Sequence, residues 1–132
     1  MIRLLVALAL MAAPTASAKF VFLQTPSHNI ACAYSTAPAN LRCDILSGLK
    51  PAPRKPPGCQ NDWTFGYQVG PTGRARKVCA GDSVYSPTAR VIRYGTTWRA
   101  GPFTCKSRTI GLRCRNRSGH GFFLSRQHSY RF

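Results

Sequence analysis

Apolar and polar residues alternate along several short stretches of the chain, and each stretch is bounded by glycine, proline, serine or asparagine. Successive side chains of a β-strand point to opposite faces, so this alternation predicts strands with one buried face. Between residues 19 and 132 there is no helical periodicity of useful length, no repeat and no coiled-coil pattern. We therefore expect an all-β fold of roughly eight to ten short antiparallel strands and hairpins. A small disulfide-bonded sandwich or a partly open barrel is the architecture that such strands favour.

The clearest hairpin lies between residues 30 and 45. When Cys32 is placed opposite Cys43, the same register also aligns apolar residues in opposing pairs, Ile30 with Ile45 and Tyr34 with Leu41. A shift of one residue would move these side chains to the other face and separate the cysteines. The pattern therefore predicts both this register and a Cys32–Cys43 disulfide.

The stretch from Gly101 to Arg126 predicts two linked hairpins, with Cys105 opposite Cys114 in the first. We expect Ile110 and Leu112 to lie on the cysteine face of the second arm. On the opposite face this register brings cations together, with Lys106 opposite Arg113 and Thr104 opposite Arg115. Like charges directly opposite each other are unfavourable. This face should therefore be exposed, either to solvent or to an anionic partner.

The remaining strand signals are weaker and shorter. They lie at Asp62–Val69, Arg74–Cys79, Val84–Tyr85, Arg90–Arg99 with an interruption at Gly95, Phe122–Arg126 and Gln127–Phe132, with a glycine-rich turn at Ser118–Gly121. The aromatic stripe Trp63, Phe65 and Tyr67 is expected to belong to the core, because it repeats at every second residue. Four prolines between residues 50 and 58 exclude a helix or a central strand there and predict an extended surface loop.

Residues 1–18 have the features of a secretory signal peptide. Arg3 supplies a positive charge, residues 4–13 form an apolar run, and Ala16-Ser17-Ala18 matches a cleavage site. The apolar run is too short to span a bilayer, so we expect no transmembrane segment. Residues 19–132 are expected to form a single secreted or periplasmic β domain.

All six cysteines lie after the expected cleavage site. An even number of cysteines in an oxidising compartment argues for three disulfides. Once the two hairpin pairs are assigned, Cys59 and Cys79 remain as the third pair. A zinc site is disfavoured because no Cys-x-x-Cys occurs in the sequence. We expect neither a metal nor a cofactor.

The chain contains a series of short motifs in a characteristic order: Pro26–Cys32, Leu41–Ile45, Cys59–Trp63, Cys79–Asp82, Tyr94–Gly95, Cys105–Ser107, Gly111–Asn116 and Gly119–Arg126. This order resembles a family of small, secreted, disulfide-bonded bacterial domains whose function is not assigned. The motifs extend over nearly all of residues 19–132, although Thr64 stands where the pattern has glycine. The resemblance implies a secreted disulfide-bonded domain. It implies no activity and supplies no catalytic residues.

Charge restricts the class of partner. The chain has 19 Lys and Arg against 3 Asp and Glu, and its formal net charge is +16. Residues 73–132 contain 13 of the cations and one aspartate. Such a field attracts anionic partners, and arginine suits two-point contacts to phosphate or carboxylate. The simplest alternative is that the charge only keeps the protein soluble.

These observations favour a secreted cationic binding or interaction module, rather than an enzyme, that acts on an anionic polymer or surface. The candidate binding residues are Lys106, Arg113, Arg115 and Arg117, and the candidate partners are nucleic acid, an envelope polymer or an acidic protein. We expect a monomer. One alternative is a secreted ribonuclease-like phosphodiesterase that uses His120 and His128 as base and acid. Another is an inhibitor or an envelope-associated structural domain.

Overall fold

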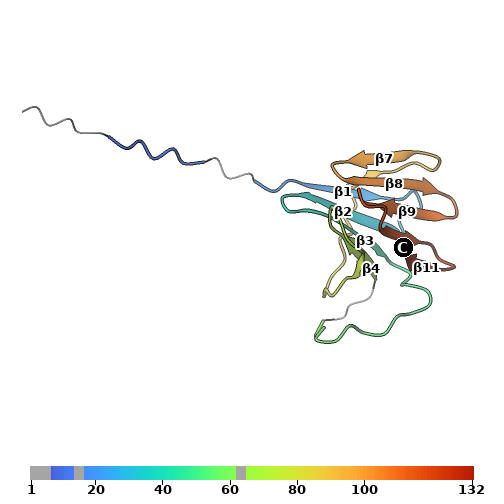
Figure 1. Cartoon of the computed structure of the whole chain (residues 1–132). Coiled ribbons are helices and arrows are strands. Elements are labelled where there is room, and N and C mark those ends of the chain that lie inside the picture. Colours follow the sequence, from blue (N-terminus) through green and yellow to red (C-terminus); the bar gives the residue numbers. More distant parts are fainter. Residues whose placement is uncertain (1–6, 14–16, 62–64) are drawn as a thin grey trace, which may run out of the picture.

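The computed structural model describes residues 7–13, 17–61 and 65–132, and the described residues form strands, turns and loops without a helix (Figure 1). Eleven strands are present in these ranges. Their bounds are β1 Phe20–Gln24, β2 Ile30–Thr36, β3 Ala39–Ile45, β4 Gly66–Val69, β5 Arg76–Lys77, β6 Arg90–Val91, β7 Thr97–Ala100, β8 Phe103–Arg108, β9 Gly111–Arg115, β10 Gly121–Leu124 and β11 Ser129–Arg131.

The strands form two open sheets. The six-stranded sheet has the order β5-β4-β3-β2-β1-β6, and the five-stranded sheet has the order β11-β10-β9-β8-β7. Neighbouring strands are antiparallel, except that β1 and β6 run parallel. The predicted all-β class is confirmed, and the sheets do not close into a barrel. The strand count is slightly above the expected range because very short pairings at β5 and β6 add to it.

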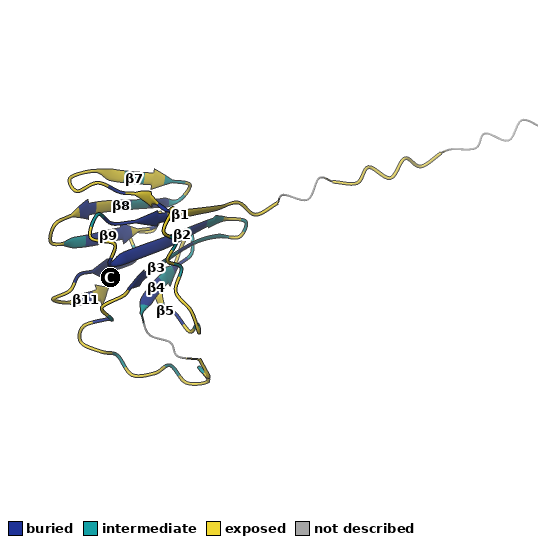
Figure 2. Cartoon of the chain, turned by 180° about the vertical axis from the view of Figure 1, so that it is seen from behind, coloured by how far each residue is buried: buried dark blue, intermediate teal, exposed yellow. Residues whose placement is uncertain are grey.

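The core lies between the two sheets, and Figure 2 shows burial concentrated on the strands while the loops are exposed. Tyr34 of β2 packs edge-on against Phe103 of β8, with ring centroids 5.7 Å apart. Tyr67 of β4 lies 5.9 Å from Phe122 of β10. Each pair joins one sheet to the other, so burial of apolar surface holds the two sheets face to face.

The predicted hairpin registers are confirmed. Cys32 faces Cys43 between β2 and β3, and Cys105 faces Cys114 between β8 and β9. Each of these pairs is disulfide-bonded, with Cα atoms 4.1 Å apart, and all four cysteines are buried in the core. The third disulfide joins Cys59 to Cys79 nearer the surface, which gives the same three pairs that the sequence predicts.

Several strand predictions were too long or wrong. The strand that ends at Val69 begins at Gly66, while the Asp62–Thr64 part of the prediction lies outside the described residues. The predicted strand at residues 74–79 is reduced to β5. Val84 and Tyr85 form no strand, because the backbone N–H of Val84 donates instead to the Asp44 carboxylate at 3.0 Å. The sequence reasoning also missed β1, whose continuous apolar run does not alternate with polar residues.

One prediction within the hairpins also needs correction. Ile110 was expected on the cysteine face, but Arg108 pairs with Gly111 and leaves Thr109 and Ile110 as the turn. Ile110 is consequently 66% exposed. The predicted interruption of residues 90–99 at Gly95 is confirmed, because Gly95 has a φ of 82° and separates β6 of one sheet from β7 of the other.

The loop between β3 and β4 runs over the surface, as its prolines predict. Its start is tied to β11, because the Ser129 N–H donates to the Lys50 carbonyl at 2.7 Å and the Lys50 N–H donates to Ser129 Oγ at 2.8 Å. Residues 7–13 extend away from both sheets and are exposed (Figure 1). Among the described residues, no helix has the length and apolar character needed to cross a membrane.

Candidate functional site

The outward face of the five-stranded sheet carries a set of cations. Alternate residues of β8 and β9 point to this face because their neighbours, including the two cysteines, point into the core. The register places Lys106 of β8 beside Arg113 of β9, and Arg115 beside Thr104. Arg99 of β7 pairs with Thr104, and Arg108 lies at the end of β8. Three of the four predicted binding cations therefore lie together.

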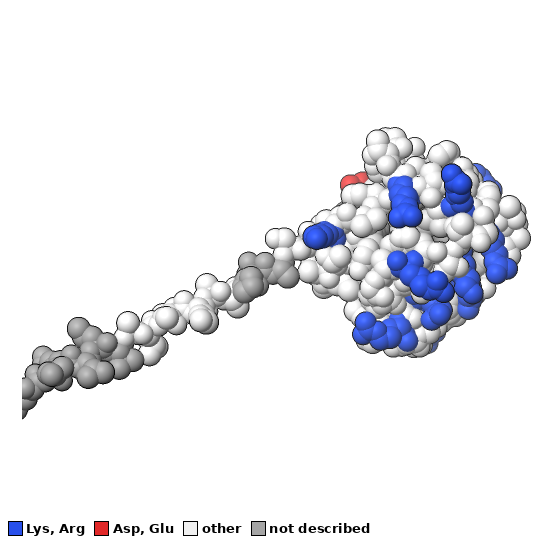
Figure 3. Space-filling model, turned by 90° about the horizontal axis from the view of Figure 1, so that it is seen from above, with Lys and Arg blue, Asp and Glu red and all other residues white. Residues whose placement is uncertain are grey.

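No carboxylate side chain compensates these cations within their own part of the chain. Residues 83–132 contain neither Asp nor Glu, and Asp44 is fully buried in an ion pair with Arg42 in the other sheet. Viewed from the side nearest β7 and β8, Lys and Arg side chains gather over the surface, and Asp and Glu appear only at its margin (Figure 3). The local field is therefore strongly positive.

A group of aromatic rings lies on the same face, over β10 and β11. Phe123 and Tyr130 are directly opposed, and their ring centroids are 5.3 Å apart. The His128 and Tyr130 rings are nearly parallel, with centroids 5.8 Å apart, and His128 also lies 5.3 Å from Phe123. Phe132 continues the group at 6.2 Å from Tyr130. The predicted face of the last strand, with His128, Tyr130 and Phe132, is thus the aromatic half of this surface.

Arg113 joins the cationic half to the aromatic half. Its guanidinium carbon lies 3.8 Å from the centroid of the Phe132 ring, which is a cation–π contact. Gly121 of β10 lies between the two halves, because its backbone pairs with Phe132 on one side and with Arg115 on the other. A Cβ at Gly121 would collide with the Cys114 carbonyl of β9, so the close strand contact requires glycine.

The two halves enclose a groove of about 740 Å³. Lys106, Arg108 and Arg113 line one side, and Phe123, His128 and Tyr130 line the other. We name these six residues, together with Arg99, Arg115 and Phe132, the cationic–aromatic face. A smaller depression lies among Thr104, Lys106, Arg113 and Arg115.

Arg117 and His120 lie elsewhere, in the turn between β9 and β10. This turn is organised by the buried side chain of Asn116, whose oxygen accepts hydrogen bonds from the backbone of Ser118 at 2.9 Å and of His120 at 3.1 Å. The Asn116 amide donates to the carbonyl of Gly73 at 2.8 Å in the other sheet's turn. Arg117 is exposed but does not lie on the cationic–aromatic face.

The structure does not bring His120 and His128 together. His120 precedes β10, whereas His128 follows it and pairs with Ser125. His120 and Ser125 are five positions apart in the chain, which corresponds to about 16 Å at the usual rise of a strand. A base and an acid that act on one phosphodiester must both lie within hydrogen-bond reach of it. His128 instead stacks on aromatic rings, so the geometry offers no support for the histidine pair of a nuclease.

Tyr67 lies in the core beneath this face, and its pKa differs from that of an exposed tyrosine. Burial raises the pKa of Tyr67, while a hydrogen bond from Ser129 and the charge of Arg131 partly oppose the rise. Among residues 7–13, 17–61 and 65–132, no three His, Cys, Asp or Glu side chains come together as a metal site. The chemistry available on the face is therefore charge, hydrogen-bond donation and stacking.

Sequence reasoning identified Lys106, Arg113 and Arg115 but missed the role of the aromatic residues beside them. The signal was present, because Phe123, Tyr130 and Phe132 occupy alternate positions of two neighbouring strands. The connection to the cations requires knowing that β10 lies between β9 and β11.

Neither a curated protein nor a solved structure matches the chain. A family model does match, and it covers residues 2–132. That model carries the description "Family of unknown function (DUF6636)", and the match extends over both sheets and all three disulfides. The chain therefore belongs to the DUF6636 family.

Proposed function

We propose that this protein binds an anionic polymer through the cationic–aromatic face. The observation that carries the proposal is the contact of Arg113 with Phe132, because it makes one surface from a group of aromatic rings and a row of cations that form no ion pair with the described residues. Charge alone would be compatible with solubility. A groove in which cations and stacked rings face each other is instead what a ligand with both anions and flat rings would use.

Each half of the face contributes in a different way. Lys106 and the arginines attract phosphate or carboxylate groups and release counterions when they bind, which gives affinity that depends on salt. The guanidinium groups also form two parallel hydrogen bonds to one anionic group. Tyr130 and His128 offer exposed rings to a base or a sugar of the same polymer. Single-stranded nucleic acid is the polymer class that uses both halves.

We further propose that binding takes place outside the cytoplasm. The predicted signal peptide at residues 1–18 and the three disulfides support an oxidising compartment, either the periplasm or the medium. The Cys105–Cys114 disulfide lies on the buried side of β8 and β9, directly beneath the binding face. It links the two strands that display Lys106, Arg113 and Arg115.

The test is an NMR titration of the oxidised protein with a single-stranded oligonucleotide. The proposal predicts the largest amide shifts at Lys106, Arg113, Phe123 and Tyr130, and binding that weakens steeply as salt increases. Inorganic polyphosphate serves as a matched ligand that has the charge but no rings. It should shift the amides of β8 and β9 and leave those of β11 nearly unchanged. Small shifts spread over both sheets would contradict the proposal, because they indicate non-specific charge attraction.

A further inference from the structure

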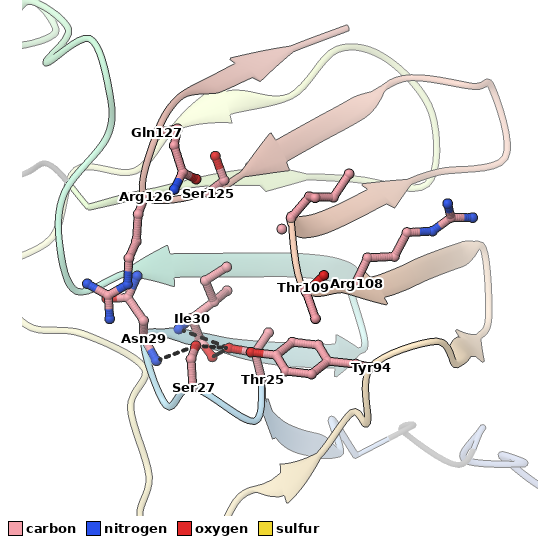
Figure 4. Close-up of a pocket in the computed structure, with 12 residues that line it drawn as sticks. Thr25, Ser27, Asn29, Ile30, Tyr94, Arg108, Thr109, Ser125, Arg126 and Gln127 are labelled. Atoms are coloured by element: carbon pink, nitrogen blue, oxygen red, sulfur yellow. Dashed lines mark hydrogen bonds between the residues drawn. The ribbon is translucent and has the colours of Figure 1, made fainter.

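A second, smaller cleft lies where turns of the two sheets meet (Figure 4). Its volume is about 140 Å³. One wall is the turn between β1 and β2, with Thr25, Ser27 and Asn29. The facing wall is the turn between β10 and β11, with Ser125, Arg126 and Gln127, while Tyr94 and the turn that follows Arg108 close the remaining sides.

The β1–β2 wall is held in one conformation. His28 has a φ of 60°, and its Nδ1 lies 2.8 Å from Oε1 of the buried Gln24. Gln24 is itself anchored, because its amide donates to the Ala89 carbonyl at 2.8 Å. Asn29 is locked to Ser47 by two hydrogen bonds of 3.0 Å. These contacts fix the positions of Ser27 and Asn29 at the cleft.

The hydroxyl oxygens of this wall accept hydrogen bonds from neighbouring backbone N–H groups. The Ser27 oxygen accepts a hydrogen bond from the Asn29 N–H at 3.3 Å, and the Thr25 oxygen accepts one from the Ile30 N–H, also at 3.3 Å. The two oxygens lie 3.1 Å apart, so one hydroxyl donates to the other, and Thr25 Oγ1 also lies 3.5 Å from the Ile30 carbonyl oxygen. When Thr25 donates to Ser27, the Ser27 hydrogen is available to an acceptor in the cleft. The Tyr94 hydroxyl points toward the same pair (Figure 4). An anion in the cleft favours the orientation in which Thr25 donates to Ser27, because the anion then accepts the Ser27 hydrogen.

Two arginines bring positive charge to this cleft. Arg126 extends from the β10–β11 turn toward Asn29 and so reaches from one sheet to the other, whereas Arg108 borders the cleft on the other side and its guanidinium points away from it (Figure 4). Neither guanidinium has a carboxylate at ion-pair distance within the described part of the chain. Both side chains are exposed, and an anion in the cleft would accept charge-assisted hydrogen bonds from the Arg126 guanidinium.

We propose that this cleft binds a single oxyanion group, such as a phosphate, a sulfate or a carboxylate, with Arg126 as the main ligand. The cleft has the volume of four or five water molecules at about 30 Å³ each, which suits one tetrahedral oxyanion and part of its carrier. Arg126 supplies a planar pair of donors, and the hydroxyl groups of Ser27 and Tyr94 complete the set. Arg108 and the turn that follows it border both sites, but Arg126, Ser27 and Tyr94 are not part of the cationic–aromatic face. The oxyanion proposal therefore does not rest on the polymer-binding proposal.

The experiment is an NMR titration with inorganic phosphate at constant ionic strength, with chloride as the exchanged ion. We expect saturable shifts at Ser27, Asn29 and Gln127, with a dissociation constant in the millimolar range. Arg126→Gln should weaken binding at least tenfold. The matched control Arg117→Gln, which removes the same charge from an exposed turn, should leave it unchanged. Shifts no larger than those caused by chloride, or equal binding by Arg126→Gln, would overturn the proposal.

Further arms identify the carrier of the oxyanion. Tighter binding of a sugar phosphate than of inorganic phosphate supports a soluble phosphorylated ligand in the cleft. Binding to vesicles that contain a phosphomonoester lipid, abolished by Arg126→Gln, supports a lipid headgroup in the same site. Arg113→Gln should reduce oligonucleotide binding and leave phosphate binding unchanged. Oligonucleotide binding and phosphate binding are thus measured separately, and the absence of one of them shows which of the two proposals has failed.

Discussion

The guanidinium of Arg113 lies over the ring of Phe132, with 3.8 Å between the guanidinium carbon and the ring centroid. The two residues belong to β9 and to the segment that follows β11, with β10 between these strands. The contact holds a cation at a defined height above the sheet without neutralising it, because an aromatic ring carries no net charge. Arg113 therefore keeps its full attraction for an anion while its side chain is restrained.

Replacement of Arg113 by lysine should separate charge from geometry. Lysine keeps the positive charge but loses the planar group that stacks on Phe132 and binds an anion at two points. We expect oligonucleotide affinity to fall about three- to tenfold, with a nearly unchanged salt dependence. Arg113→Gln should lower both the oligonucleotide affinity and its salt dependence, because it also removes the positive charge. Fluorescence anisotropy at several salt concentrations measures the two effects, and equal affinity of Arg113→Lys and the wild type would argue against a role for the stacked geometry.

Tyr130 should contribute to binding only when the ligand carries rings. Loss of one stacked base costs about 1–3 kcal/mol in single-strand-binding proteins. Tyr130→Ala should therefore weaken oligonucleotide binding about five- to 150-fold and leave polyphosphate binding unchanged. Tyr85→Ala is a matched control, because Tyr85 is 43% exposed and Tyr130 is 42% exposed. If both variants bind the oligonucleotide equally well, the aromatic half is not part of the site.

Gly111 supports the floor of the groove. Its φ is 148°, and a Cβ there would lie 2.6 Å from a ring carbon of Phe123 and 2.5 Å from the Leu124 carbonyl oxygen. Gly111→Ala should lower the free energy of unfolding by about 2–4 kcal/mol, through backbone strain and crowding together. Gly119→Ala should cost about 1–2 kcal/mol, because Gly119 has a φ of 81° but nothing lies within 4 Å of its added Cβ. Urea denaturation compares the two, and equal losses would show that the Phe123 contact has no energetic effect.

The ion pair of Arg42 with Asp44 should be essential to the stability of the six-stranded sheet. Asp44 is fully buried and accepts hydrogen bonds from Arg42 Nε at 3.0 Å and from Arg42 Nη2 at 2.8 Å. Arg42→Ala would leave this carboxylate buried without its cation, and we expect a loss of about 3–5 kcal/mol. Arg76→Ala, an exposed cation on β5, should change stability by less than about 0.5 kcal/mol. A similar small effect of Arg42→Ala in thermal or urea denaturation would contradict this assignment.

The raised pKa of Tyr67 predicts that the stability of the protein depends on pH in the alkaline range. Burial raises the pKa of Tyr67 above the ordinary value of 10.0, so the folded protein holds this proton more tightly than the unfolded chain. The resulting stabilisation is complete below pH 10 and is lost as the pH rises through the folded-state pKa. The free energy of unfolding should therefore fall more steeply above pH 10 in the wild type than in Tyr67→Phe. Parallel curves for the two proteins would contradict the raised pKa.

The local parts of the fold could be predicted because two independent patterns coincide. Cys32 with Cys43, and the apolar pairs beside them, agree on one register, and a hairpin needs no information from distant segments. The register of Lys106 with Arg113 followed in the same way. The cationic half of the candidate site was thus accessible from the sequence, because both of its strands belong to one hairpin.

The remaining features depend on long-range arrangement. The parallel pairing of β1 with β6 joins residues far apart in the chain, and neither strand carries a distinctive pattern. The backbone N–H of Val84 donates to Asp44, forty positions earlier in the chain, and is therefore not available for strand pairing. No local sequence pattern indicates such a contact. The aromatic half of the site and the oxyanion cleft likewise arise only when turns and strands from separate hairpins come together.

The most direct test of the central claim compares two variants that lose the same charge. One carries Lys106→Gln, Arg113→Gln and Arg115→Gln on the cationic–aromatic face, and the other carries Arg54→Gln, Lys55→Gln and Arg76→Gln away from that face. The first should bind a single-stranded oligonucleotide at least tenfold more weakly than the wild type, with a salt slope smaller by about 2. The second should stay close to the wild type in both respects. Equal losses in the two variants would show that net charge, and not this face, determines binding.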